Sequence, residues 1–144
     1  MNQPTELLLV EDDPRDIELT LRVFREHKLT NHVIVARDGE EAVRILLPDD
    51  PSVPAPHPRF VLLDLKLPKL NGLEVLRRIR GDPRTRALPV VILTSSRVAP
   101  DLKEAYEIGV NSYLCKPVEF DAFVNIVKNL GLYWLLLNEA PVAP

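Results

Sequence analysis

Five short apolar runs constrain this chain more than any other feature. Each is four or five residues long, and their β-branched residues and flanking Pro and Asp favour strands over short buried helices. Three of the runs are nearly continuous in apolar residues, which is typical of strands covered on both faces of a parallel sheet. We therefore predict five buried strands. They span Glu6–Val10, Val33–Ala36, Phe60–Asp64, Val90–Thr94 and Ser112–Cys115.

Between these runs, apolar residues recur at intervals of three and four, the spacing of one helix face. Pro14 fits the first turn of the first helix, and Pro48 ends the second. Gly109 stands where a C-terminal cap would follow the fourth helix. The expected helices cover residues 14–28, 40–47, 72–80, 101–108 and 119–137. The last one carries a core-facing stripe of Phe120, Phe123, Val127, Leu130 and Trp134.

This regular alternation of strand and helix predicts the fold class. Strand–helix–strand units form right-handed crossovers and a parallel sheet with helices on both faces. We expect an α/β, doubly wound, five-stranded parallel sheet with five helices. The 144 residues suffice for one domain, residues 1–144, with a core over residues 5–137 and a tail over residues 138–144. The proline-rich stretch at residues 49–59 reads as a stiff exposed connection, with a binding segment as the less favoured alternative.

Composition excludes several classes of function. The formal net charge of −3 is too small to predict a nucleic-acid surface. No apolar stretch approaches the ~20 residues of a membrane span, and the N-terminus does not resemble a signal peptide. The single cysteine, Cys115, excludes an intramolecular disulfide and fits a cytoplasmic protein. We expect Cys115 to be a packed, structural thiol.

Polar residues follow four of the predicted strands. Glu11 and Asp12 come after the first, Asp64 and Thr94 end the third and fourth, and Lys116 follows the fifth. In open α/β sheets, ligands bind outside the carboxyl ends of the strands, at the point where the strand order reverses. With the strand order 2-1-3-4-5, Asp12 would face Asp64, and Thr94 and Lys116 would lie alongside.

This group of residues predicts phosphoryl chemistry. Three carboxylates in one cleft require a cation, and hard carboxylate oxygens suit Mg²⁺. Asp64 is the best candidate nucleophile, while Lys116 and the Thr94 hydroxyl could bind phosphoryl oxygens. Each residue alone has an ordinary explanation, as a solvated loop, a turn, a strand residue or a surface lysine. Their joint occurrence at strand ends favours the functional interpretation.

Four motifs resemble those of CheY-like response-regulator receiver domains, over about residues 5–137. LLLVEDDPRD resembles the first-strand acidic motif, and VLLDLKLPKLNG resembles the phosphorylation motif with Asp64 as acceptor and Pro68 and Gly72 at the usual spacing. VVILTSS and YLCKP resemble the motifs around the switch hydroxyl and the active-site lysine. The resemblance implies a flavodoxin-like fold and a single-domain regulator that accepts a phosphoryl group from a histidine kinase. It also implies that the peptide bond before Pro117 is cis.

The resemblance also implies individual roles. Asp12, Asp64 and the backbone carbonyl of Lys66 would bind Mg²⁺, and Glu11 would act through a metal-bound water. Thr94 and Lys116 would hold the phosphoryl oxygens, and Thr94 and Tyr113 would move together as a switch. Lys66 and Ser96 would flank the water that removes the phosphoryl group. The protein would then catalyse only its own phosphorylation and dephosphorylation.

The proline-rich insertion and the C-terminal sequence LYWLLLNEAPVAP are similar to regulators of phytochrome-type histidine kinases. Such regulators tend to dimerise through the last helix and strand. Because successive helical residues point about 100° apart, Tyr133, Leu136 and Leu137 cannot all face one core. We expect a homodimer through these residues; the alternative is a helix that folds back on its own domain.

Two other functions remain open at this point. A phosphatase with an aspartyl-phosphate intermediate would resemble D-x-D-x-T, whereas the second residue after Asp64 is Lys66. A pseudo-receiver that is never phosphorylated is disfavoured by the complete set of polar residues at the strand ends. The sequence identifies neither the kinase, nor the stimulus, nor the output partner.

Overall fold

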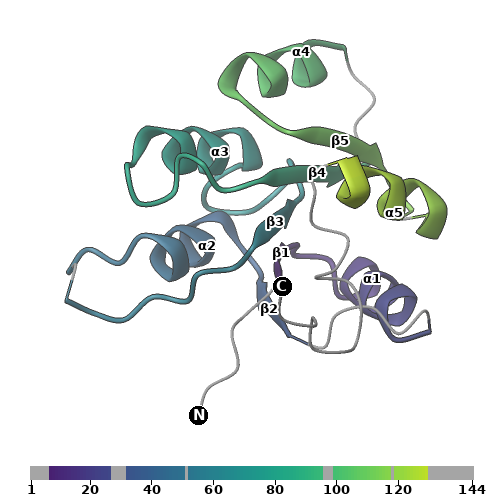
Figure 1. Ribbon diagram of the computed structural model, residues 1–144, viewed down its shortest axis with the longest axis horizontal. Helices are drawn as coiled ribbons and strands as arrows, with labels where there is room; N and C mark the ends of the chain where they lie inside the picture. The colour runs from purple at the N-terminus through teal and green to yellow at the C-terminus, as the bar shows by residue number, and fades with distance from the viewer. Residues whose placement is uncertain (1–6, 27–31, 51, 96–98, 118, 130–144) are drawn as a thin grey trace, which may run out of the picture.

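The computed structural model describes residues 7–26, 32–50, 52–95, 99–117 and 119–129, with only the backbone described for Ala99 and Val127. Strands and helices alternate throughout (Figure 1). The strands are β1 (Leu7–Val10), β2 (Val33–Ala36), β3 (Phe60–Leu63), β4 (Val90–Thr94) and β5 (Ser112–Cys115). The helices are α1 (Pro14–Glu26), α2 (Gly39–Leu46), α3 (Gly72–Gly81), α4 (Ala99–Ile108) and α5 (Phe120–Asn129).

The sheet has the order β2-β1-β3-β4-β5, and every pair of neighbouring strands is parallel. The predicted doubly wound, flavodoxin-like fold is therefore confirmed. Strand order reverses between β1 and β3, where Val10 pairs with Leu63. The residues that follow these two strands consequently share one edge of the sheet.

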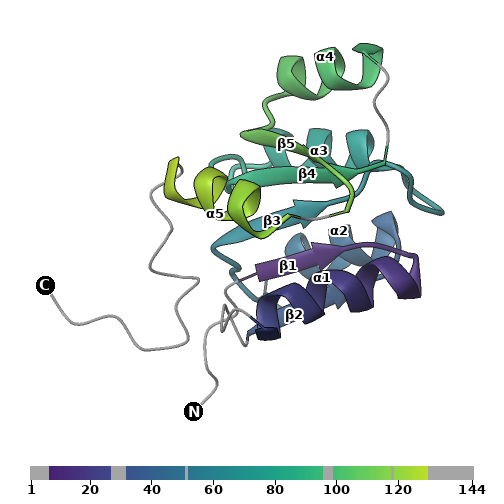
Figure 2. The same ribbon diagram turned by 90° about the vertical axis from the view of Figure 1, so that its right-hand side faces the viewer.

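Alternate strand residues divide the core between the two faces of the sheet. Leu8, Val61 and Ile92 pack with the cluster beneath α2, α3 and α4. Leu7, Leu62 and Leu93 pack with Phe24 of α1 and Phe123 of α5. Figures 1 and 2 show these two groups of helices on opposite faces. Burial on both faces explains why the central strands are continuous apolar runs.

Helix boundaries differ from the expected ones by one or two residues. Helix α2 begins at Gly39, because the Asp38 side chain caps it by accepting a hydrogen bond from the Glu41 amide at 2.7 Å. Helix α4 begins at Ala99, so Pro100 lies in its first turn rather than before it. Helix α5 is described to Asn129, and Phe120 and Phe123 of the expected stripe pack in the core. Leu130 and Trp134 lie outside the described residues.

The prediction of a packed Cys115 is wrong, because this side chain is exposed. Among the described strands, β5 lies at the edge of the sheet and pairs only with β4, and its residues are half-buried or exposed. Cys115 is the last residue of that strand. The expected strand order already places this strand at the edge of the sheet, but its apolar sequence wrongly favoured a packed last residue.

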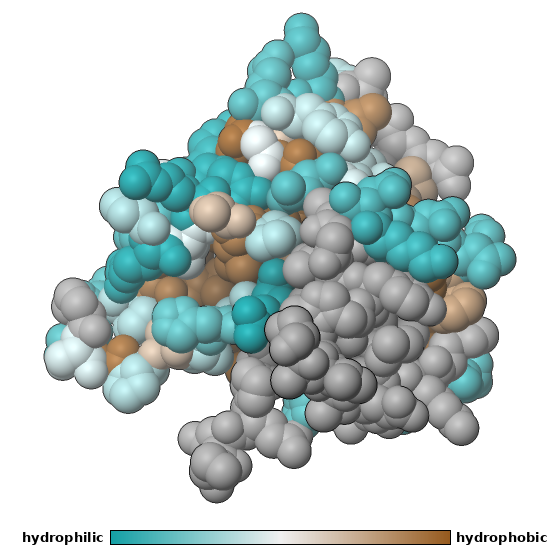
Figure 3. Space-filling model, viewed as in Figure 1, coloured by the Kyte–Doolittle hydropathy of each residue, from teal (hydrophilic) through white to brown (hydrophobic). Residues whose placement is uncertain are grey.

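The proline-rich connection between α2 and β3 is largely exposed, as predicted, although Pro58 is buried. With the α3–β4 connection it borders a hollow of about 540 Å³, lined by residues that include Leu46, Val53, Pro56, Arg84 and Leu88. Figure 3 shows apolar residues on the molecular face between these two connections. The lining residues Arg59 and Pro89 immediately precede β3 and β4. The hollow therefore lies at the opposite edge of the sheet from the residues that follow the strands.

Within the described part of the chain, no helix combines the length and the apolar character needed to cross a membrane.

Candidate functional site

Strand register places Glu11 and Asp64 next to each other. The Asp64 amide donates to the carbonyl of Val10 at 3.0 Å, and the Glu11 amide donates to the carbonyl of Ala36 at 2.9 Å. The two residues thus continue β1 and β3 by one position beyond the last paired residues. Both residues are buried, at 3% and 5% relative exposure. Two carboxylates therefore converge at the point where strand order reverses.

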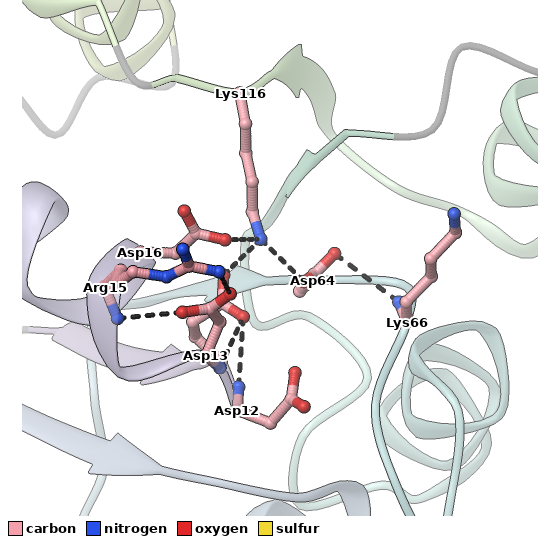
Figure 4. Close-up of polar contacts among 8 residues, drawn as sticks. Asp12, Asp13, Arg15, Asp16, Asp64, Lys66 and Lys116 are labelled. Carbon is pink, nitrogen blue, oxygen red and sulfur yellow. Dashed lines mark hydrogen bonds and ion pairs between the residues drawn. The ribbon is translucent and has the colours of Figure 1, made fainter.

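Lys116 reaches this pair from the far edge of the sheet. Its amide donates to the carbonyl of Thr94 at 2.9 Å, and its peptide bond to Pro117 is cis, as the resemblance implied. The Nζ atom lies 2.8 Å from Asp64 Oδ2 and 2.9 Å from Asp16 Oδ2, and it also pairs with Glu11 Oε1. Figure 4 shows the ammonium between Asp16 and Asp64. One cation thus joins three carboxylates.

Electrostatics in this cluster favour the charged lysine. Burial alone would lower the pKa of Lys116, but the hydrogen bonds that its ammonium donates to Asp64, Glu11 and Asp16 outweigh burial and raise the pKa. Glu11 behaves differently although it shares this contact. Burial, with the nearby negative charge of Asp64, raises the pKa of Glu11 to about 7 against the opposing pull of Lys116. The cluster therefore holds excess negative charge that one ammonium does not fully neutralise.

The donor set fits a hard divalent cation. One carboxylate oxygen from each of Glu11, Asp12 and Asp64 lies within 4.8 Å of the others. Asp12 is exposed, whereas Glu11 Oε2 accepts from the amides of Asp12 and Asp13 at 3.0 and 3.2 Å. A site with few protein carboxylates and one side open to water is what Mg²⁺ requires, since it keeps several waters. Asp12 and Asp64 are thus suitable ligands, and Glu11 stands behind them.

A close backbone approach fixes the loop that carries Asp64. The Gly72 amide donates to the carbonyl of Leu65 at 2.8 Å. A methyl group at Gly72 would overlap the backbone carbonyl oxygen of Asp64, so the start of α3 packs directly on the acceptor residue. Lys69, in the same loop, has a positive φ of 69°. The expected spacing of Pro68 and Gly72 thus has a steric reason, namely a tight turn beneath the site.

The switch residues occupy their expected places. Thr94 ends β4 and is fully buried, next to the paired residue Cys115 and one step from Lys116. Tyr113 is half-buried on β5, opposite Ile92, and packs on the face that α2, α3 and α4 cover. Their joint movement stays a prediction.

The structure gives less support to the roles predicted for the remaining residues. The Lys66 amide donates to Asp64 Oδ1 at 3.4 Å, but Figure 4 shows the exposed Lys66 side chain extending away from Asp64. Its role as a metal ligand through the carbonyl stays a prediction. Ser96, Tyr133, Leu136 and Leu137 lie outside the described residues, so their expected roles are untested.

Sequence reasoning missed the position of Asp16. Asp13 and Asp16 both lie at the start of α1, where a carboxylate commonly caps or stabilises a helix. Asp13 does so, because its Oδ1 accepts from the Arg15 amide at 2.8 Å. Asp16 instead contacts Lys116. Helical spacing could have indicated this, since Asp16 lies one turn beyond Asp12 and therefore near the same sheet edge.

A family model for the response regulator receiver domain matches residues 7–128, and the chain belongs to this family of two-component signalling proteins. Receiver domains bind Mg²⁺ or Mn²⁺ at an acidic pocket. Among solved structures, the chain is similar to the bacteriophytochrome response regulator AtBRR, with 49% identity and a TM-score of 0.80. This match covers 96% of this chain and 100% of that one.

The chain is also similar to the response regulator Rcp1 of Synechocystis sp., with 35% identity over 99% of this chain and 97% of that protein. The Mn²⁺-bound form of Rcp1 matches with a TM-score of 0.74 over 98% of this chain and 99% of that one. A third relative, the probable methanogenesis regulatory protein FilR2 of Methanothrix harundinacea, is 41% identical over 96% of this chain and 88% of that protein.

Proposed function

We propose that this protein accepts a phosphoryl group from a sensor histidine kinase onto Asp64 and thereby changes a surface that binds a partner or a second copy. The observation that carries the proposal is the position of the Asp64 carboxylate. It is buried where strand order reverses, 2.8 Å from Lys116 Nζ and within 4.8 Å of two further carboxylates. Placing carboxylates this close together costs free energy unless the site binds cations and anionic groups.

In the transfer step, an Asp64 carboxylate oxygen attacks phosphorus in line with the bond to the donor. A new P–O bond forms, the P–N bond to the kinase histidine breaks, and its electron pair returns to the imidazole nitrogen. Lys116 moves its charge from the Asp64 carboxylate to the phosphoryl oxygens, and the Thr94 hydroxyl donates a hydrogen bond to them. Asp12 and Asp64 would hold Mg²⁺, which would neutralise negative charge on the phosphoryl group.

This mechanism needs no separate substrate turnover, so the protein is a phosphoacceptor that catalyses only its own phosphorylation and dephosphorylation. The phosphatase alternative needs a general acid two residues after the nucleophile. That position holds Lys66, which is exposed and extends away from Asp64. A pseudo-receiver that is never phosphorylated would not explain why Lys116 contacts the acidic cluster.

The names of two relatives support a phytochrome-type kinase as the partner, since AtBRR is a bacteriophytochrome response regulator and the structures similar to this chain include a phosphorylated cyanobacterial phytochrome response regulator. FilR2 carries a different name at 41% identity, so similarity alone does not select the kinase. We propose a bacterial phytochrome kinase in the cytoplasm as the first candidate. Phosphotransfer from a panel of purified kinases would test this, and faster transfer from a non-phytochrome kinase would contradict it.

The acceptor assignment is tested by incubating wild type and Asp64→Asn with acetyl phosphate and Mg²⁺, followed by mass spectrometry of intact protein and peptides. We expect one added phosphoryl group on Asp64 in the wild type and none in the variant, because an amide is a poor nucleophile. Asp64→Asn should unfold at a denaturant concentration equal to or above that of the wild type, since one of three crowded carboxylates loses its charge. Equal labelling of both proteins would place the acceptor elsewhere.

A further inference from the structure

Among the described residues, Asp16 is the one carboxylate on the Lys116 ammonium that does not belong to the acidic cluster of Glu11, Asp12 and Asp64. It lies in the first turn of α1, and its Oδ2 is 2.9 Å from Lys116 Nζ. Figure 4 shows Asp16 and Asp64 on different sides of that nitrogen. Asp16 thus reaches the site through Lys116.

An ammonium group has three N–H donors, and in this structure three carboxylates engage it. On the proposed function, on which this inference rests, two of these partners find other bonds during the reaction. Asp64 becomes the acyl phosphate, and Glu11 would face a bound Mg²⁺ together with Asp12. Asp16 is the partner that can stay with the ammonium throughout.

Asp16 is well placed to hold its position. The neighbouring Ile17 and, further along the helix, Thr20 and Phe24 are buried, which fixes α1 on the sheet. A carboxylate in the first turn of a helix is also stabilised by the helix dipole. Lys116, by contrast, carries its charge on a flexible four-carbon stem that has many rotamers. A fixed anion beside Nζ restricts those rotamers.

We propose that Asp16 is a positioning residue for phosphoryl transfer: it holds one N–H of Lys116, so that the other two point at Asp64 and at the oxygens of the incoming phosphoryl group. Its effect therefore passes through Lys116. A purely electrostatic role would have the opposite sign, because a fourth negative charge repels the phosphoryl group and its removal would speed labelling.

The test measures the initial rate of Asp64 labelling by acetyl phosphate with saturating Mg²⁺, by mass spectrometry. We expect Asp16→Ala to react about fivefold more slowly than wild type, a fraction of the ~100-fold that a 1 Å misplacement can cost. Asp16→Asn keeps an oxygen acceptor and should recover most of the rate. Glu18→Ala is the matched control, because Glu18 lies on the same helix and pairs with Arg25 on the surface. It should react at the wild-type rate.

A second arm asks whether Asp16 acts through Lys116. In a Lys116→Met background, followed over longer incubations, Asp16→Ala should cause no further slowing. Urea unfolding of every variant shows whether a slower reaction reflects the lost contact or a loss of the folded structure. The inference is overturned if Asp16→Ala reacts as fast as or faster than wild type, or slows equally in both backgrounds. If wild type itself gains no phosphoryl group on Asp64, the proposed function fails rather than the role of Asp16 alone.

Discussion

Glu11 is a buried member of the acidic cluster that would hold a metal. Its carboxylate is 3% exposed, accepts two backbone amides and faces Lys116, Asp64 and Asp12. Burial and the Asp64 charge raise the pKa of Glu11 from its ordinary 4.5 to about 7. Between these two values, the folded protein holds a proton that the unfolded chain releases.

This proton predicts that stability falls as pH rises from about 4.5 to 7, because the folded state binds more protons than the unfolded state in that window. The contribution of Glu11 has a slope of at most about 1.4 kcal/mol per pH unit and levels off above pH 7. Urea unfolding with a chelator between pH 5 and 8 measures it. Glu11→Gln should lose this slope, and the exposed Glu40→Gln should keep it. Parallel curves for wild type and Glu11→Gln would contradict the prediction.

At the level of single residues, the sequence predicted the site where an apolar run ends in a charged residue. Glu11, Asp64 and Lys116 could be found this way, because the carboxyl ends of parallel strands meet at one edge. Asp16 was missed because it lies on a helix rather than at a strand end, and only its helical spacing from Asp12 indicates that it lies near this edge. Cys115 was assigned wrongly, because the apolar character of a four-residue run does not show how well its last residue is covered at the edge of the sheet.

Arg80, near the C-terminal end of α3, bonds to two connections between elements. Its Nε donates to the Gly109 carbonyl at 2.8 Å, and its Nη1 donates to the Leu88 carbonyl at 2.6 Å. Its Nη2 donates to Asn111 Oδ1 at 2.9 Å, and that oxygen also accepts the Val90 amide at 2.7 Å. One planar guanidinium thus links α3 to the connections before β4 and β5.

We therefore predict that Arg80→Lys lowers the free energy of unfolding by about 2 kcal/mol, because an ammonium cannot reproduce the planar fork and leaves carbonyls without donors. Arg78→Lys, on the exposed side of the same helix, should change stability by less than about 0.5 kcal/mol. Urea denaturation with m-values compares the two. If both variants unfold at the same urea concentration, this linkage contributes little to the fold.

At the level of elements, strand positions were predictable within a residue, because the core on both faces requires unbroken apolar runs. The ends of the helices were less predictable than the positions of the strands. Asp38 caps α2 one residue earlier than expected, and Pro100 is accepted inside the first turn of α4 because a proline there removes no helical hydrogen bond.

For the whole molecule, the sequence predicts a homodimer through Tyr133, Leu136 and Leu137, which lie beyond the described residues. A two-fold interface would bury the same apolar patch on both subunits. In sedimentation experiments, wild type should dimerise, with an equilibrium that shifts when Asp64 is phosphorylated. The double variant Tyr133→Asp, Leu136→Asp should be monomeric. A control that places aspartates at the exposed Leu19 and Val53 should dimerise like wild type.

A wild-type protein that is monomeric at high concentration in both phosphorylation states would exclude this dimer. A double variant that still dimerises would assign the contact to another surface.

The contact between Lys116 and Asp16 spans 100 residues of sequence, and its contact with Asp64 spans 52. During translation, Asp64 and the other acidic residues of the cluster leave the ribosome long before Lys116, which pairs with them. A nascent chain that ends before β5 therefore carries the acidic cluster without its cation. On the proposed mechanism, the phosphoryl-binding site is therefore complete only once translation has passed residue 116.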